Sequence, residues 1–200
     1  MTLEAKLDEP LRNTIVVLIG FAGTGKYTIG RELCRRTGAK LIDNHLINNP
    51  LFTVIKTDAV TPLPKAIWSK VGAVRQVVYE TIRELSPPEM SFVFTMQLFE
   101  SDPLDHAAFA TLVELAHTRQ SLFLPVRLIC EVDELCRRIV NPARAEMLKD
   151  ISAESARRRS ADHSLLHPAH PNLKTIDVTQ KSPAESAAEI LEEIRSIKAG

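Results

Sequence analysis

The sequence Ile15-Val16-Val17-Leu18-Ile19-Gly20-Phe21-Ala22-Gly23-Thr24-Gly25-Lys26 decides the fold. Residues 15–19 are branched and apolar, and no polar side chain alternates with them. A strand without a polar face is buried on both sides, which is typical of a parallel sheet covered by helices. The glycine-rich residues 20–25 follow directly, and a helix is predicted after them. The stretch therefore has the order strand, glycine-rich loop, helix.

This order is the context that a phosphate-binding loop requires. The glycines permit backbone dihedral angles closed to other residues, so that successive N–H groups can converge on phosphate oxygens. The following helix N-terminus adds unpaired donors, and Lys26 is placed to bridge the β- and γ-phosphates of a nucleotide. A plain glycine-rich turn is the alternative, but it does not explain a lysine at this point. The residues expected to bind ATP here are Gly20, Ala22, Gly23, Thr24, Gly25, Lys26, Tyr27 and Thr28.

One position departs from the motif. The residue after the loop lysine is normally Ser or Thr, whose hydroxyl binds Mg²⁺, and here it is Tyr27. A phenol at the end of a rigid ring cannot occupy the same point, and Thr28 lies further round the helix, where it faces the α-phosphate. Three readings stay open: the metal uses other ligands, Tyr27 among them; the chain binds nucleotide with weakened catalysis; or Tyr27 stacks on a ligand.

Strands and helices alternate along the rest of the chain. Further strands are predicted at residues 40–43, 91–96, 124–130 and 173–178, and helices at 31–36, 66–85, from 102 through 115, and from 182 to 197. This alternation predicts an α/β fold with a five-stranded parallel sheet, whose strand carboxyl ends share one ligand-binding edge. Residues 1–200 are expected to form a single domain, with a small helical lid inserted at about 133–171.

Composition limits the function. The chain of 200 residues has 25 Lys and Arg against 25 Asp and Glu, so no net positive charge favours nucleic acid as a partner. Its 3 cysteines form no C-x-x-C pair, which argues against a disulfide framework or structural zinc. Residues 1–13 lack the apolar core of a signal peptide, and the longest apolar stretch, 15–23, is too short to cross a bilayer. We expect a cytoplasmic monomer or homodimer without a membrane or nucleic-acid partner.

From Thr14 to Ile197 the order of parts resembles the small P-loop kinases, the group of nucleoside monophosphate kinases, shikimate kinase and gluconate kinase. The resemblance rests on the loop 20–28, an acidic residue ending the second strand, arginines after the fourth strand, and a short loop and helix after the fifth. It implies a three-layer P-loop NTPase fold, ATP and Mg²⁺ as cofactors, and phosphate transfer to a small-molecule acceptor.

The second strand ends in Asp43, and His45 follows closely. Shikimate kinase-like enzymes have D-x-D at this point, so the resemblance implies that Asp43 places Mg²⁺ through water or accepts the proton of the acceptor hydroxyl. A helix N-cap at Asp43 and a merely exposed His45 are the alternatives. The third strand ends without an acid, and Thr95 and Gln97 are read as substrate-side groups or as ordinary polar residues.

Arg138 and Arg144 have the R-x(5–7)-R spacing of the lid in these kinases. The resemblance implies that one arginine flanks the adenine and the other neutralises the transferring phosphate; a solvated basic face is the alternative. Arg157-Arg158-Arg159 is expected to be solvated. Lys181 and Ser182 stand where such kinases cradle the adenine, although an N-terminal capping box alone explains Ser182.

The sequence thus predicts an ATP-dependent phosphotransferase acting on a small hydroxylated molecule. Its catalytic candidates are Lys26, Asp43, Arg138 and Arg144. Two other hypotheses stay open: a nucleotide-binding module with little or no kinase activity, and a nucleoside monophosphate kinase.

Overall fold

The computed structural model describes residues 10–55, 63–142, 144 and 148–199. Within them, five parallel strands form one sheet in the order β2-β3-β1-β4-β5. The strands are β1 (Thr14–Ile19), β2 (Lys40–Asp43), β3 (Phe92–Met96), β4 (Leu122–Ile129) and β5 (Lys174–Asp177). The predicted α/β class and five-stranded parallel sheet are confirmed.

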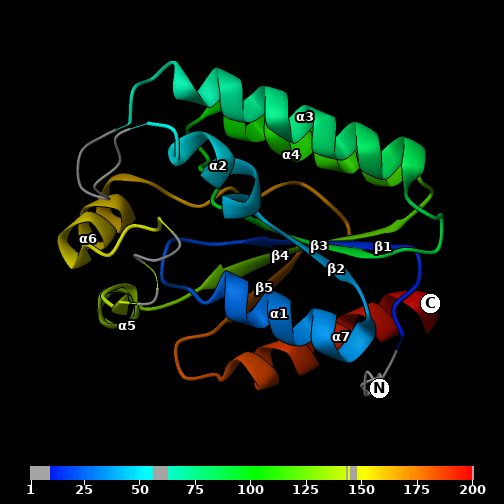
Figure 1. Ribbon diagram of the computed structural model, residues 1–200. Helices are drawn as coiled ribbons and strands as arrows, with labels where there is room; N and C mark the ends of the chain where they lie inside the picture. The colour runs from blue at the N-terminus through cyan, green and yellow to red at the C-terminus, as the bar shows by residue number, and fades with distance from the viewer. Residues whose placement is uncertain (1–9, 56–62, 143, 145–147, 200) are drawn as a thin grey trace, which may run out of the picture.

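Helices cover both faces of the sheet, which makes three layers (Figure 1). On one face lie α1 (Lys26–Thr37) and α7 (Pro183–Ala199), and on the other lie α3 (Ile67–Leu85) and α4 (Pro103–Thr118). The shorter helices are α2 (Asn44–Phe52), α5 (Val132–Ile139) and α6 (Ala153–Asp162). Figure 1 shows α5 and α6 together at the left, beyond the carboxyl ends of the strands.

The central strand β1 explains why the two layers of helices form. Its residues alternate between the two cores: Val16 and Leu18 pack with α1 and α7, whereas Ile15, Val17 and Ile19 pack with α3 and α4. All of these side chains are fully buried. Apolar side chains on both faces therefore stabilise the sheet in the middle of the molecule, as the unbroken apolar run predicts.

Several boundaries differ from the prediction. Helix α1 begins at Lys26 rather than near Arg31, directly after the glycine-rich loop. Helix α2 was not predicted as an element. Asp43 caps it, as the N-cap alternative for this residue requires: the Asp43 carboxylate accepts from the backbone N–H of His45 at 3.3 Å. The predicted cap of α4 is confirmed, since Asp102 accepts from the N–H of Leu104 at 2.9 Å.

The region expected as a lid, about 133–171, contains α5 and α6, but its last residues pack with the body of the molecule. The chain returns to the body after α6, where Leu165 and Leu166 are buried and the N–H of Leu166 donates to the Leu98 carbonyl at 3.0 Å. Leu166 also packs in the core beneath α3 and α4. Residues 165–166 therefore pack with the body, and the helices of this region are α5 (Val132–Ile139) and α6 (Ala153–Asp162).

No helix among the described residues is both long and apolar enough to cross a membrane.

Candidate functional site

The glycine-rich loop connects the buried β1 to α1 at the carboxyl edge of the sheet. Gly23 and Gly25 have φ angles of 94° and 90°, which side chains with a Cβ rarely adopt. Gly20 is restricted by space instead, because a Cβ there would lie 2.7 Å from Oγ1 of Thr24 and 3.2 Å from the Leu128 carbonyl oxygen. Among the described residues, no side chain caps α1. The backbone N–H groups of its first turn are therefore available to bind an anion.

Lys26 lies over this loop. Its Nζ donates to the carbonyl oxygens of Gly20 and Phe21 at 2.7 and 2.8 Å. Burial and the positive charge of Arg144 lower the pKa of Lys26 from 10.5 to about 7, with smaller contributions of the same sign from Lys149 and Arg159. The loop therefore holds a lysine whose charge is poorly compensated and that an anion would stabilise.

The polar residues at the carboxyl end of the third strand support the loop and the second strand. Gln97 accepts from the N–H of Ala22 at 2.9 Å, so it contacts the loop itself. Thr95 is buried, and its hydroxyl donates to Oδ1 of Asp43 at 2.6 Å while accepting from the N–H of Asn44 at 3.1 Å. Both side chains position other groups of the site, which is a role that the sequence did not suggest.

Asp43 is the acidic side chain whose charge acts on both Lys26 and Lys149. It is 3 % exposed, and its Oδ2 lies 3.2 Å from Nζ of Lys149 and 3.6 Å from Nδ1 of His45. Burial alone raises the pKa of Asp43, but the contacts with His45 and Thr95 and the charge of Lys149 outweigh it and hold that pKa well below its usual range. Burial lowers the pKa of His45, so its ring is neutral at neutral pH.

Lys149 was missed by the sequence analysis. Its side chain is buried, and its ammonium lies 4.3 Å from the centre of the Tyr27 ring as well as beside Asp43. Arg144 holds the backbone next to it, through Nε and Nη2 bonds to the Asp150 carbonyl at 3.2 and 3.1 Å. Nothing local in the sequence separates Lys149 from the other basic residues of this stretch.

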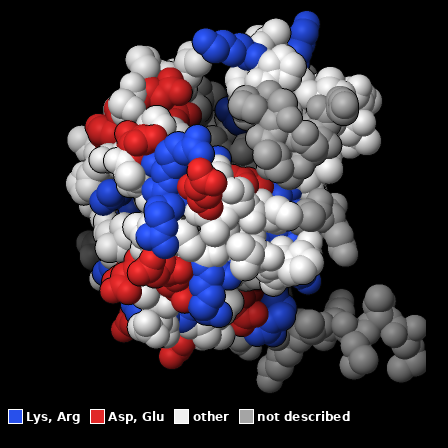
Figure 2. All heavy atoms as spheres, turned by 90° about the vertical axis from the view of Figure 1, so that its left-hand side faces the viewer, with Lys and Arg blue, Asp and Glu red and all other residues white. Residues whose placement is uncertain are grey.

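The arginine run on α6 divides by exposure. Arg157 and Arg158 form exposed ion pairs with Asp133 and Glu154, as the expectation of a solvated run requires. Arg159 instead turns inward, donates to Asp150 and Ser155, and lies close enough for its charge to act on Lys26. Figure 2 shows the face that carries α5 and α6, on which Lys and Arg side chains are interspersed with acidic ones.

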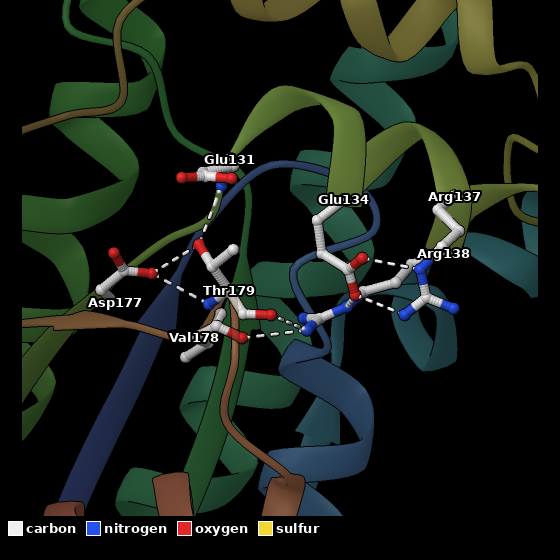
Figure 3. A network of polar contacts seen from close by, with 7 residues as sticks. All are labelled: Glu131, Glu134, Arg137, Arg138, Asp177, Val178 and Thr179. Carbon is white, nitrogen blue, oxygen red and sulfur yellow. Dashed lines mark hydrogen bonds and ion pairs between the residues drawn. The ribbon is translucent and has the colours of Figure 1, made fainter.

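Arg138 connects α5 to the loop after β5 (Figure 3). Its Nη2 donates to the carbonyl oxygens of Val178 and Thr179 at 2.9 and 2.8 Å, and its Nε pairs with Glu134. Glu134 also pairs with the exposed Arg137, and these two arginines lower the pKa of Glu134 to about 2. The guanidinium of Arg138 is therefore held in one place by acceptors on two elements.

A cavity of about 190 Å³ lies between the loop and Arg138. Its lining residues are Thr24, Gly25, Thr28, Ile29, Arg138, Val178, Lys181 and Pro183. Lys181 at its edge pairs with Glu189, and Ser182 forms the predicted capping box, donating to and accepting from Glu185. The cavity therefore lies directly beside the glycine-rich loop and is bordered by residues of α5, of the loop after β5 and of α7.

The same residues do not fit a magnesium ion as they lie. Oδ1 of Asp43 is engaged by Thr95 and Oδ2 by Lys149, and the ring of Tyr27 faces the Lys149 ammonium. Among the described residues, no group of three or more His, Cys, Asp and Glu side chains can hold a metal ion. Asp43 and Tyr27, both predicted as metal ligands, both contact the ammonium of Lys149.

Solved structures with this architecture are numerous. The chain matches a gluconokinase from Sinorhizobium meliloti at 15 % identity with a TM-score of 0.61, over 92 % of this chain and 93 % of that one. An APS kinase from Mycobacterium tuberculosis matches at 15 % identity and a TM-score of 0.54, over 93 % and 99 % of the two chains. A shikimate kinase from Acinetobacter baumannii in complex with shikimate matches at 19 % identity and a TM-score of 0.51, over 98 % and 97 %.

No protein-family model and no curated protein sequence matches the chain. The similarity to the solved structures nevertheless extends over almost the whole length of both partners. The chain has the fold of the small P-loop kinases.

Proposed function

We propose that this protein is an ATP-dependent phosphotransferase whose acceptor is a small molecule carrying a hydroxyl group. One observation carries the proposal: the half-buried Lys26 of the glycine-rich loop lies near the ionised Asp43, which ends β2. Phosphate transfer needs these two things most, a cationic cradle and a group that orients the attacking oxygen. The kinase names of the structural neighbours agree with it.

The nucleotide side of the reaction belongs to the loop and Arg138. Lys26 and the first amides of α1 would hold the β- and γ-phosphates, and Lys26 would exchange its bonds to Gly20 and Phe21 for bonds to phosphate oxygens. Arg138 and the residues around it would flank the base in the adjoining cavity, with Thr28 and Lys181 at its walls. Arg144 would neutralise charge on the transferring group, since its own charge acts on Lys26.

The acceptor side belongs to Asp43 and its neighbours. As the acceptor oxygen bonds to the γ-phosphorus, the bond from that phosphorus to the bridging oxygen breaks, ADP leaves, and the hydroxyl proton passes to Oδ2 of Asp43. A carboxylate with so low a pKa is a weak base, so Asp43 acts chiefly by orienting the hydroxyl, and the proton moves late. His45, neutral and half-buried, would bind the acceptor as a hydrogen-bond partner.

A second candidate is a nucleotide-binding module with weak catalysis. The ion pair between Asp43 and Lys149 favours it, because a carboxylate already paired is less available to an acceptor. A screen that measures ADP release from ATP distinguishes the kinase from the module. The acceptors to test are sugars, sugar acids, nucleosides, nucleoside monophosphates and antibiotics. An acceptor that raises ADP release and is recovered phosphorylated supports the kinase, whereas ATP binding without any phosphorylated acceptor supports the module.

A further inference from the structure

The buried Lys149 is the feature that the proposed kinase chemistry leaves unexplained. Only 6 % of this residue is exposed, and an ammonium so placed is costly unless other groups compensate its charge. Two groups do so here: Oδ2 of Asp43 at 3.2 Å and the face of the Tyr27 ring at 4.3 Å. The site thus contains a built-in cation between the loop helix and the second strand.

Tyr27 makes sense as part of this arrangement. It occupies the position after the loop lysine, where a Ser or Thr hydroxyl would offer an oxygen to Mg²⁺. The phenol oxygen of Tyr27 lies at the end of a rigid ring and cannot occupy the same point, but the negative face of that ring attracts an ammonium. Tyr27 thus replaces a hydroxyl that would bind Mg²⁺ by an aromatic ring, and the Lys149 ammonium lies over that ring.

The balance of charge points the same way. Lys26, Arg144 and Lys149 lie near one another, since the charges of Arg144 and Lys149 both lower the pKa of Lys26, and Asp43 is their shared acid. Arg159 adds a further charge but is paired with Asp150. Free ATP is more negative than its magnesium complex by the charge of the ion, so a site with an excess of fixed cations suits the free nucleotide.

We propose that Lys149 takes the place of the divalent cation, so that the chain binds free ATP with Lys149 bridging Asp43 and the phosphates. The inference rests on the proposed function, because it assumes that ATP binds at this loop. Lys149 has the donors for such a bridge, since an ammonium carries three and the Asp43 carboxylate is one acceptor. Its ammonium already contacts the Asp43 carboxylate and the Tyr27 ring, so the charge needs little reorganisation when the nucleotide arrives.

The first test uses the unaltered chain. Its dissociation constant for ATP is measured by calorimetry in excess EDTA and again in excess Mg²⁺. We expect the two constants to agree within about threefold, because the cation that the phosphates need is already present. Binding in Mg²⁺ that disappears in EDTA would overturn the inference.

The second test removes the charge. Lys149→Met keeps a long apolar stem, and we expect it to bind ATP about tenfold more weakly in EDTA, with most of the loss recovered in Mg²⁺ because Asp43 is released. Lys174→Met is the matched control, since Lys174 pairs with Glu193 on the α7 side of the sheet, and it should change neither constant. Equal affinity of Lys149→Met and the unaltered chain in EDTA would contradict the proposal.

Two further variants guard against misfolding of Lys149→Met. Lys149→Arg keeps a cation over the ring and should still bind ATP in EDTA, whereas Tyr27→Ser replaces the ring by a hydroxyl and should bind better in Mg²⁺ than in EDTA. Loss of ATP binding by Lys149→Arg in EDTA, or tighter binding of ATP by Tyr27→Ser in EDTA than in Mg²⁺, would contradict the inference. Failure of the unaltered chain to bind ATP in both buffers would overturn the nucleotide site itself, whereas binding only with Mg²⁺ would overturn the role of Lys149 alone.

Discussion

The Nη2 atom of Arg138 lies 2.9 Å from the carbonyl oxygen of Val178, so a side chain of α5 is bound to the loop that follows β5. The same nitrogen also reaches the Thr179 carbonyl, and Thr179 in turn accepts from the N–H of Glu131 at 3.0 Å (Figure 3). These contacts join the two walls of the cavity beside the glycine-rich loop. The shape of the expected nucleoside site therefore depends on one guanidinium.

Replacing this guanidinium tests the cavity. Arg138→Met loses the bonds to Val178 and Thr179, and we expect the dissociation constant for ATP to rise about tenfold. Arg137→Met is the matched control, because Arg137 is exposed and pairs with the same Glu134. It should leave both the ATP affinity and the free energy of unfolding unchanged, since an exposed ion pair contributes little. Equal effects of the two variants in calorimetry would remove Arg138 from the nucleotide site.

Proton uptake on ATP binding tests the environment of Lys26. Its pKa in the folded chain is lowered to about 7, so between that value and the ordinary 10.5 the folded chain has released a proton that the unfolded chain keeps. A bound phosphate favours the charged ammonium and raises this pKa again, so ATP binding at about pH 8.5 should take up a proton.

The measurement is the binding enthalpy in buffers with different enthalpies of ionisation. At about pH 8.5 the enthalpy should vary with the buffer, and at about pH 6, where Lys26 is already protonated, the variation should fall. In the absence of ligand, the same group makes stability rise with pH through this window, because the unfolded chain binds the extra proton. A binding enthalpy independent of buffer at both pH values would show that Lys26 stays charged throughout.

Because the space around Gly20 is filled, adding a single methyl group at this position should destabilise the folded chain. A Cβ there would meet the Thr24 side chain and the Leu128 backbone, so Gly20→Ala should lower the free energy of unfolding by about 1–3 kcal/mol and weaken ATP binding. Gly72→Ala is the control, since a Cβ at this position of α3 meets nothing within 4 Å. It should stabilise the chain by about 0.5–1 kcal/mol in denaturant unfolding. A Gly20→Ala chain as stable as the unaltered one would mean that the loop adapts freely.

Asp43 should matter more for turnover than for nucleotide affinity. Asp43→Asn keeps the size of the side chain but loses its charge, and we expect kcat to fall about 10²-fold or more while ATP affinity changes less than tenfold. Asp133→Asn, at an exposed acid paired with Arg157, should leave both unchanged. Once an acceptor is known, steady-state kinetics checks this, and a rise in KM with constant kcat would make Asp43 a binding residue only.

The parts of the fold that local sequence determines were predictable. The buried β1, the loop up to Lys26 and the caps at Asp102 and Ser182 each depend on neighbouring residues, and the structure contains them as predicted. Helix α2 was not predictable in the same way, because Pro50 lies inside it and its cap, Asp43, was read chiefly as a site residue. Its formation depends on packing of Ile47 and Phe52 with Val71 of α3, a contact that no local pattern indicates.

The candidate site was only partly predictable for the same reason. The loop motif identified Lys26, and strand-end position identified Asp43. Thr95 bonds to Asp43 because β2 pairs with β3. Lys149 contacts Asp43 and Tyr27, which lie far from it in the sequence. The separation of Arg159 from Arg157 and Arg158 likewise depends on which side of α6 faces the body. Such contacts between distant residues carry most of the electrostatics of the site.

Transfer of labelled γ-phosphate from ATP to an acceptor, compared between the unaltered chain and Lys26→Met, tests the central claim most directly. Lys174→Met serves as the control for loss of a lysine elsewhere. The account predicts a labelled acceptor with the unaltered chain and with Lys174→Met, and a loss of about 10²-fold or more with Lys26→Met. Transfer by Lys26→Met at the unaltered rate would contradict the account, since the glycine-rich loop would then not be the site of phosphate transfer.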